Sequence, residues 1–193
     1  MDESVIAAIA KWPNVPAVFG WIGLTSRGEW RLRGQPIANQ GICDFIGRNY
    51  AGDERGRWFF QNGPQRVFVE LEVAPWIWRL GSAARAPIRA HTGRAARRLE
   101  GAWLDESGRL FLQTDMGFGL VDSTDSARAV ESLSVGGAHP LANDDLDAWL
   151  AGLGPDISLV GHELGLQGDV TLGRLREVDM PQRFGYVRVP QPK

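Results

Sequence analysis

The stretch Asp53-Glu54-Arg55-Gly56-Arg57-Trp58-Phe59-Phe60-Gln61 returns later in the chain as Asp105-Glu106-Ser107-Gly108-Arg109-Leu110-Phe111-Leu112-Gln113. Six of the nine positions are identical. Each copy predicts a polar turn, with glycine where the backbone needs a positive φ, followed by a strand of aromatic and aliphatic residues. Two interpretations stay open. Either a protein with many hairpins reuses this turn, or the chain duplicates one α+β unit, with halves near residues 14–80 and 86–193. The hairpin arm after each copy favours duplication.

Strands and short helices are predicted around both copies. Residues 56–61 and 66–73 read as a hairpin, because apolar and polar side chains mostly alternate in its second arm. The second copy lies within a predicted meander of strands over residues 99–104, 110–113 and 118–121. Helices are expected over residues 5–12, 38–50 and 143–153. The last of these places four apolar residues on its core face: Leu146, Trp149, Leu150 and Leu153.

These patterns predict an α+β protein of mainly antiparallel sheet with a few short helices, built from two related units in tandem. The segment from Gly81 to Ala86 contains only small residues and one arginine, which is typical of a boundary between units. We therefore expect an N-terminal α+β unit over residues 1–82 and a C-terminal β-rich α+β unit over residues 83–193.

The amino-acid composition limits which binding partners and which cellular location we expect. The 193 residues include 44% hydrophobic and 23% charged residues, which is ordinary for a protein that buries a core. The formal net charge of −2 supplies no field toward nucleic acid or anionic membranes, so neither is expected as a partner. No apolar stretch approaches the roughly 20 residues that cross a bilayer. Cys43 is the only cysteine, which fits a cytoplasmic location.

Motifs for catalysis are missing from the sequence. His91, His139 and His162 are far apart, and there is no Cys-x-x-Cys pair, no phosphate loop of the Walker type and no Gly-x-Ser-x-Gly elbow. We therefore assign no catalytic residue, no metal ligand and no cofactor, and an enzyme is the less favoured class.

The most unusual local feature is the arginine-rich segment between Arg79 and Arg98, which contains no acidic residue. Arginine offers paired donors to carboxylate or phosphate. Trp76 and Trp78 precede it and would share one face of a strand. The predicted ligand site, placed near the junction of the two units, consists of Arg79, Arg85, Arg89, His91, Trp76 and Trp78.

Alternatives to this site stay open. The arginines could form a solvated face or pair with acids elsewhere in the chain. In a protein-interaction or assembly module, the tryptophans and arginines would form a subunit interface, with a homo-oligomer as the result. A phosphate- or anion-binding enzyme is the third reading. The leading hypothesis is a non-enzymatic cytoplasmic ligand-binding or regulatory module, whose partner is a small anionic ligand or another protein.

Several motifs together resemble a family of bacterial proteins. They include Lys11-Trp12-Pro13-Asn14-Val15-Pro16-Ala17 followed by Gly20-Trp21, then Gly28-Glu29-Trp30, Gly34-Gln35-Pro36-Ile37, Val67-Phe68-Val69-Glu70 and Ala74-Pro75. The pattern resembles uncharacterised proteobacterial proteins that are classed as domains of unknown function and built from two tandem, related α+β domains. The resemblance covers about the first two-thirds of the chain. It implies the fold and a regulatory or sensing role, and it supplies no activity.

Overall fold

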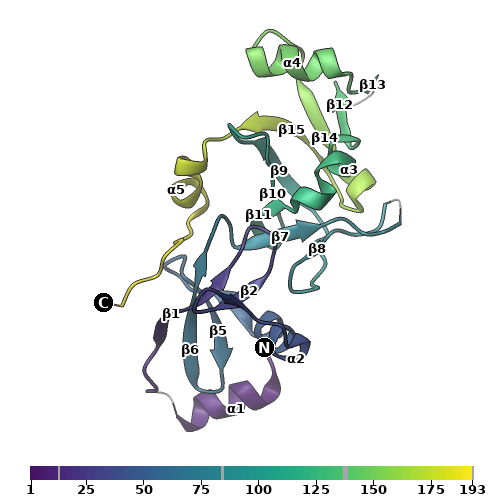
Figure 1. Ribbon diagram of the computed structural model, residues 1–193. Coiled ribbons are helices and arrows are strands. Elements are labelled where there is room, and N and C mark those ends of the chain that lie inside the picture. The colour runs from purple at the N-terminus through teal and green to yellow at the C-terminus, as the bar shows by residue number, and fades with distance from the viewer. Residues whose placement is uncertain (13, 84, 137–138, 193) are drawn as a thin grey trace. The chain divides into compact units, whose positions relative to one another are not determined.

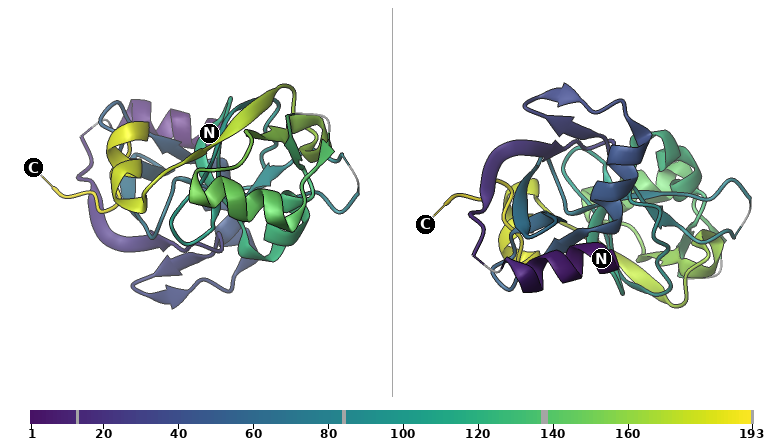
Figure 2. Two further views of the ribbon diagram at one scale, coloured as in Figure 1. Left: turned by 90° about the horizontal axis from the view of Figure 1, so that it is seen from above. Right: turned by 90° about the horizontal axis from the view of Figure 1, so that it is seen from below.

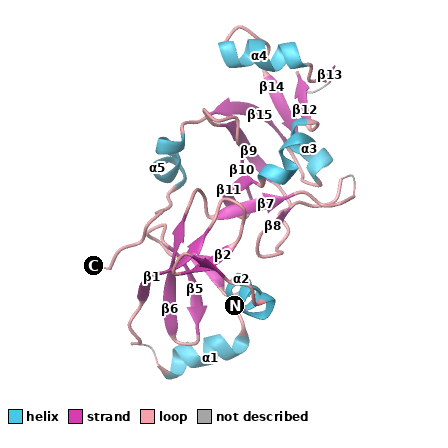
Figure 3. Ribbon diagram, in the orientation of Figure 1, coloured by secondary structure: helices cyan, strands magenta, loops and turns pink. Residues whose placement is uncertain are grey.

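The computed structural model describes residues 1–12, 14–83, 85–136 and 139–192. The chain divides into two compact units, each assembled from separate segments. Unit 1 comprises residues 1–75, 91–93 and 181–193, and unit 2 comprises residues 76–90 and 94–180. The linear division between residues 82 and 83 stays a prediction, because neither unit is one continuous segment. Both units are built around a β-sheet, and its strands are the magenta arrows in Figure 3.

Unit 1 contains a six-stranded sheet in the order β3-β2-β1-β6-β5-β4, and its helices include α1 and α2 (Figure 1). The elements are α1 (Glu3–Lys11), β1 (Val18–Leu24), β2 (Trp30–Leu32), β3 (Gln35–Pro36), α2 (Gln40–Arg48), β4 (Tyr50–Gly52), β5 (Trp58–Asn62) and β6 (Gln65–Leu71). The predicted hairpin is confirmed, since β5 and β6 pair in antiparallel register with Phe59 opposite Phe68. The predicted helices over residues 5–12 and 38–50 correspond to α1 and α2.

The two faces of this sheet differ because side chains alternate along each strand. Ile22, Val69 and Phe60 are buried on the inner face, where Ile46 of α2 is also buried. The Phe45 ring of α2 lies edge-on to Phe60, with centroids 6.3 Å apart. The outer face, on the other side of β1 and β6, carries Glu70 and Arg66.

Unit 2 contains a nine-stranded sheet in the order β13-β12-β14-β15-β9-β10-β11-β7-β8. Its strands are β7 (Trp76–Arg79), β8 (Arg89–Ala90), β9 (Leu99–Leu104), β10 (Leu110–Thr114), β11 (Gly117–Val121), β12 (Leu133–Val135), β13 (His139–Pro140), β14 (Ile157–Val160) and β15 (Asp169–Arg174). Its helical segments are η1 (Ser123–Asp125), α3 (Ser126–Val130), α4 (Asn143–Ala151), η2 (Gly161–Leu164) and η3 (Glu177–Asp179). The helix α5 (Met180–Phe184) begins at the last residue of unit 2 and otherwise belongs to the C-terminal segment of unit 1, which is yellow in Figure 2.

The same strand arrangement occurs in both units. In unit 1, β1 pairs antiparallel with β2 and parallel with β6, and β6-β5-β4 is an antiparallel meander. In unit 2, β7 pairs antiparallel with β8 and parallel with β11, and β11-β10-β9 is the corresponding meander. The predicted α+β class with mainly antiparallel strands is therefore confirmed, and the units are related by topology as well as by sequence. No helix in the described part of the chain is both long and apolar enough to span a membrane.

One local prediction is wrong. The helix expected over residues 143–153 exists as α4, but Leu150 and Leu153 are 49% and 87% exposed. Trp149 is the buried residue of the expected face. The Arg174 guanidinium lies 4.6 Å from the centre of its ring, so a charged side chain covers the tryptophan where more apolar residues were expected.

Candidate functional site

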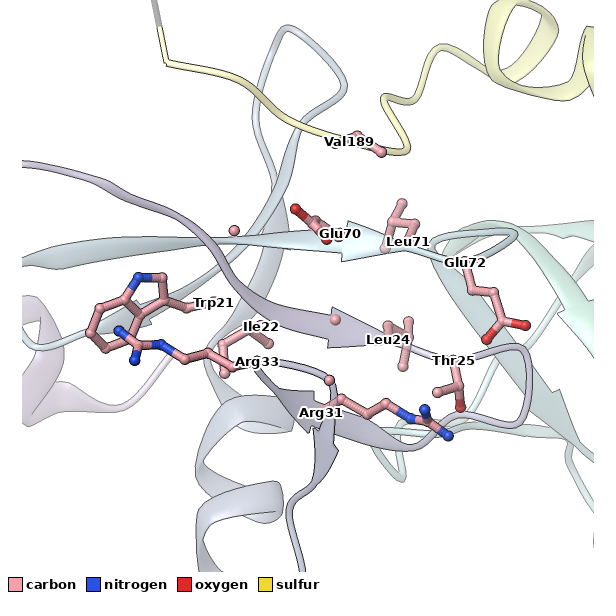
Figure 4. Close-up of a pocket in the computed structure, with 13 residues that line it drawn as sticks. Trp21, Ile22, Leu24, Thr25, Arg31, Arg33, Glu70, Leu71, Glu72 and Val189 are labelled. Atoms are coloured by element: carbon pink, nitrogen blue, oxygen red, sulfur yellow. The ribbon is translucent and has the colours of Figure 1, made fainter.

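A groove of about 290 Å³ lies on unit 1 between β1, the β2–β3 hairpin and β6. Figure 4 shows the side chains that line it, with Trp21 and Arg33 together at one end and Glu70 on the opposite side of β1. Val189 of the C-terminal segment also borders it. The groove therefore lies on one continuous sheet, within a single unit.

Gly23 creates the space in the middle of this groove. It lies in β1 directly between Arg31 of β2 and Glu70 of β6 in the strand register. A Cβ atom at Gly23 would meet a single neighbour, the backbone oxygen of Glu70 at 3.7 Å. A guanidinium and a carboxylate therefore flank a strip of bare backbone.

Arg33 and Trp21 form the wall at one end. Arg33 and Gly34 are the two residues between β2 and β3, and both have positive φ, at +48° and +79°. This is the geometry of a tight two-residue hairpin turn, where asparagine is more usual than arginine at the first position. The Arg33 N–H donates to the Trp21 carbonyl at 2.7 Å. Its guanidinium lies 4.0 Å from the centre of the Trp21 ring, which is 48% exposed.

Charge on the groove is divided between its two sides. Glu72 is held in place at the far end, because its carboxylate accepts hydrogen bonds from the Ser26 N–H at 2.9 Å and hydroxyl at 3.0 Å. Arg31 lies 3.9 Å from Glu29, which is a loose surface pair. Within the described residues, neither Glu70 nor Arg33 has an ion-pair partner within 4.0 Å. Both residues line the groove, Arg33 beside Trp21 and Glu70 on the other side of β1.

A second polar site in unit 1 begins at the turn between β4 and β5. The Asp53 Oδ1 accepts hydrogen bonds from the backbone N–H groups of Arg55 at 3.0 Å and Arg57 at 2.9 Å, and Oδ2 accepts from Arg57 Nε at 2.8 Å. Gly56 has the positive φ that the sequence predicts, +73°. Partial burial raises the pKa of the Asp53 carboxyl, but these hydrogen bonds outweigh burial and hold the pKa below its ordinary value.

The corresponding turn of unit 2 has the same hydrogen bonds. Asp105 Oδ1 accepts from the N–H groups of Ser107 at 2.9 Å and Arg109 at 2.8 Å, and Oδ2 accepts from Arg109 Nε at 2.7 Å. Gly108 has a φ of +74°. The repeated sequence is therefore a repeated structure.

Beside the unit 1 turn lies a cavity of about 530 Å³, which we call the Arg57 pocket. Its charged lining consists of Asp53, Glu54, Arg55, Arg57 and Arg66. Sequence reasoning missed this pocket, although one signal was available. The first copy of the turn has Arg55 where the second copy has Ser107, so the two copies differ in charge at this position.

The predicted tryptophan pair lies in the interior of unit 2. Trp76 and Trp78 share a face of β7, as expected, and their rings stack with centroids 6.1 Å apart. They are 2% and 0% exposed, so they anchor the core of that unit. The Trp76 Nε1 donates to the Met116 carbonyl at 2.8 Å.

Two of the three predicted arginines, Arg79 and Arg85, have acidic neighbours. Arg79 lies 3.4 Å from the Asp122 carboxylate and stands opposite Arg89 in the β7–β8 register. Arg85 donates to Glu163 at 3.1 Å. This hydrogen bond is the main cause that lowers the pKa of Glu163.

His91 belongs to unit 1, whereas the other five predicted residues belong to unit 2. Its ring packs against Trp30 and Tyr50, with centroids 5.0 and 5.6 Å away. The alternative in which arginines pair with distant acids thus describes Arg79 and Arg85. A ligand-binding role for the six residues stays a prediction.

Comparison with known protein families shows a match to almost the entire chain. The family DUF2944, described as "Protein of unknown function (DUF2946)", matches residues 1–191. The chain belongs to the DUF2944 family. The expectation of an uncharacterised family is therefore confirmed, and the description of DUF2944 names no activity.

Other similarities of this DUF2944 protein are partial. It is 29% identical over 96 residues to lipid-A-disaccharide synthase of Prochlorococcus marinus (strain MIT 9313). That match covers 48% of this chain, and the chain spans 23% of the length of the synthase.

Two solved structures match part of the chain. A DUF1285 family protein from Silicibacter pomeroyi DSS-3 has a TM-score of 0.47 and 16% identity, covering 76% of this chain and 99% of that one. A DUF1285 family protein from Shewanella baltica OS155 has a TM-score of 0.44 and 13% identity, covering 56% of this chain and 89% of that one.

Proposed function

We propose that this DUF2944 protein is a non-enzymatic ligand-binding module of the cytoplasm, and that the groove over Gly23 holds a small zwitterionic ligand. The observation that carries the proposal is the position of Gly23 between Arg31 and Glu70, with no side chain to fill the space. A ligand with an anionic and a cationic group would satisfy both sides of the groove at once.

Arg33, which lies beside Trp21, would supply a directed hydrogen-bond donor to the ligand. The Arg33 guanidinium is a planar donor that lies against the Trp21 ring, and a donor that is held in this way loses less freedom when it binds a carboxylate. The positive φ of Arg33 costs about 1–2 kcal/mol in an L-residue, so the turn holds an arginine where glycine or asparagine is less strained. That strain is explained if the Arg33 side chain contacts the ligand.

The groove volume suits a small metabolite. At about 290 Å³ it is at the lower end of the usual range for ligand pockets. An amino acid or a compound of similar size is the expected class. The single cysteine supports the cytoplasmic assignment, because no disulfide within the chain can form.

A thermal-unfolding screen tests this proposal. The compounds are amino acids, each with a matched acid that lacks the amine and a matched amine that lacks the acid. A ligand at 100 times its dissociation constant adds about 2.7 kcal/mol to stability, which shifts the midpoint measurably. We expect the amino acid to act and the two matched compounds to act weakly.

Variants locate the site. Gly23→Val fills the groove without backbone strain, because its Cβ meets only one atom, so we expect a folded protein with no ligand shift. Arg85→Ala/Arg89→Ala, in the segment predicted from sequence, should keep the shift. A shift that survives Gly23→Val but is lost in the arginine variant would refute the groove and support that segment. No shift with any compound would argue against small-ligand binding and favour the protein-interaction alternative.

A further inference from the structure

The Arg57 pocket has a counterpart in unit 2, and the strand register matches their residues. Arg57 corresponds to Arg109, and Arg55 to Ser107, through the repeated turn. Gln61 stands opposite Arg66 in the β5–β6 pair, and Gln113 stands opposite Phe118 in the β10–β11 pair, so Arg66 corresponds to Phe118.

In unit 2 the position beside the turn arginine is filled by a carboxylate from the chain itself. The Arg109 guanidinium donates to Glu177 Oε2 at 2.6 Å in addition to Asp105. Burial lowers the pKa of Arg109, but the hydrogen bonds to Asp105 and Glu177 outweigh it and raise the pKa. The Glu177 N–H in turn donates to the Glu106 carboxylate at 3.0 Å.

Glu177 reaches this position because β15 extends the sheet of unit 2. β15 pairs in parallel with β9, and the Leu175 N–H donates to the Leu104 carbonyl at 3.0 Å. η3, which begins at Glu177, follows directly. In unit 1 the strand equivalent to β9 is β4, and β4 is the last strand of its sheet. The described part of unit 1 therefore has no strand equivalent to β15 to deliver a glutamate.

The charge of the Arg57 pocket differs from the charge around Arg109. Three arginines line the Arg57 pocket with two carboxylates, and Arg57 is already paired with one of these, Asp53, at 2.7 Å. In unit 2 the arginines at two of these positions are replaced by Ser107 and Phe118, and Glu177 is added. The Arg57 pocket thus lacks a carboxylate equivalent to Glu177. Its lining also carries more positive charge than the corresponding residues of unit 2.

Two of the guanidinium groups in the pocket lie against aromatic rings. Arg57 lies 4.5 Å from the centre of the Phe68 ring, and Arg66 lies 4.8 Å from the centre of the Phe59 ring. The two rings pack together with centroids 5.8 Å apart. A guanidinium that lies against an aromatic ring keeps its N–H donors free for a carboxylate, and it loses less freedom when it binds one.

We propose that the Arg57 pocket is a second ligand site, which binds a small dicarboxylate. One carboxylate takes the place on Arg57 that Glu177 takes on Arg109, and the other is bound by Arg55 and Arg66. This inference is independent of the groove over Gly23, because it rests on the comparison of Arg57 with Arg109.

The test is a titration of the full chain with succinate, followed by NMR of backbone amides and arginine side chains. Acetate and inorganic phosphate serve as competing probes. We expect saturable shifts at Arg55, Arg57 and Arg66, with a dissociation constant near or below about 1 mM. Acetate should bind more weakly, because it carries one carboxylate.

Three variants complete the experiment. Arg55→Ser and Arg66→Phe introduce the residues of unit 2, and each should weaken succinate binding by about tenfold. Arg27→Ser, on the β1–β2 turn of the same unit, removes the same charge and should have no effect. Gly23→Val should also bind succinate normally, which separates this site from the groove.

Three results would overturn the proposal. Equal weakening in Arg27→Ser would mean general charge attraction, and the absence of saturation would mean no site. Tighter binding of phosphate than of succinate would replace the dicarboxylate by a phosphate ligand.

Discussion

Gly56 and Gly108 hold the same position in two turns with the same hydrogen bonds, yet different segments surround them. The C-terminal segment of unit 1 crosses the first turn, where the Val187 N–H donates to the Gly56 carbonyl at 2.8 Å. The second turn receives Glu177 from η3 on its arginine side. A short local sequence thus specifies the turn, and chain segments from far away determine what the turn contacts.

The difference has a functional consequence. In unit 2 the turn arginine, Arg109, pairs with Asp105 and Glu177 of the chain itself, so this turn stabilises the fold. In unit 1 the arginine side of the turn opens on a cavity, so the same turn is available for a ligand.

The largest effect is expected from alanine at the two glycines. Both substitutions place a side chain at positive φ, which costs about 1–2 kcal/mol. In Gly56→Ala the new Cβ would also overlap the Gly185 carbonyl oxygen, whereas Gly108→Ala meets no atom within 4 Å. Urea denaturation should therefore show a loss of about 3 kcal/mol or more for Gly56→Ala, with overpacking as the added cost. Equal losses in the two variants would show that the C-terminal segment does not hold this turn.

Asp53→Asn tests the charge of the first turn, because asparagine keeps one oxygen acceptor and loses the ion pair with Arg57. We expect a loss of about 1–2 kcal/mol at neutral pH. Since the folded-state pKa of Asp53 lies below its ordinary value of 3.8, its stabilising effect is complete above that value. The effect disappears as the pH falls through the folded-state pKa. Denaturation of wild type and variant from pH 7 to acid pH should converge, and a constant difference would contradict the assigned cause.

Glu177→Ala converts the second turn into an open site like the first. Removing a partly exposed charged hydrogen bond should cost about 1 kcal/mol. Added formate should raise the unfolding midpoint of the variant more than that of wild type, because the formate carboxylate can occupy the vacated position on Arg109, whereas the Arg57 pocket is present in both proteins. The measurement is the unfolding midpoint with formate or chloride at equal ionic strength. Equal responses of the two proteins would show that Glu177 does not occupy an anion site.

Local parts of the fold were predictable from sequence, and long-range parts were not. The turn, the β5–β6 hairpin and the β9–β10–β11 meander follow from glycine position and from alternation over a few residues. The pairing of β15 with β9 joins residues about 70 positions apart and leaves no local pattern. The return of the C-terminal segment to unit 1, where the Tyr186 hydroxyl donates to the Val73 carbonyl at 2.8 Å, is equally non-local.

The predicted site shows the same limit. The arginine-rich segment is visible in the sequence, but Asp122 and Glu163, which pair with Arg79 and Arg85, are distant residues. The groove over Gly23 depends on the register of three strands, and a single glycine in a strand does not reveal it. By contrast, the Arg57 pocket was detectable in principle, because the two copies of the turn differ in charge at Arg55 and Ser107.

The smallest effect on stability is expected for Arg55→Ser and Ser107→Arg, which give each turn the residue of the other. Arg55 is exposed, and its side chain has no ion pair within the described residues, so Arg55→Ser should change the free energy of unfolding by less than about 0.5 kcal/mol. Ser107→Arg should be equally neutral, because its added charge lies on the surface next to Glu106. Urea denaturation measures both. Succinate binding should nevertheless fall in the first variant and stay unchanged in the second. A loss above about 1 kcal/mol in Arg55→Ser would mean that Arg55 supports the turn, and its weakened binding could then no longer be ascribed to contact with the ligand.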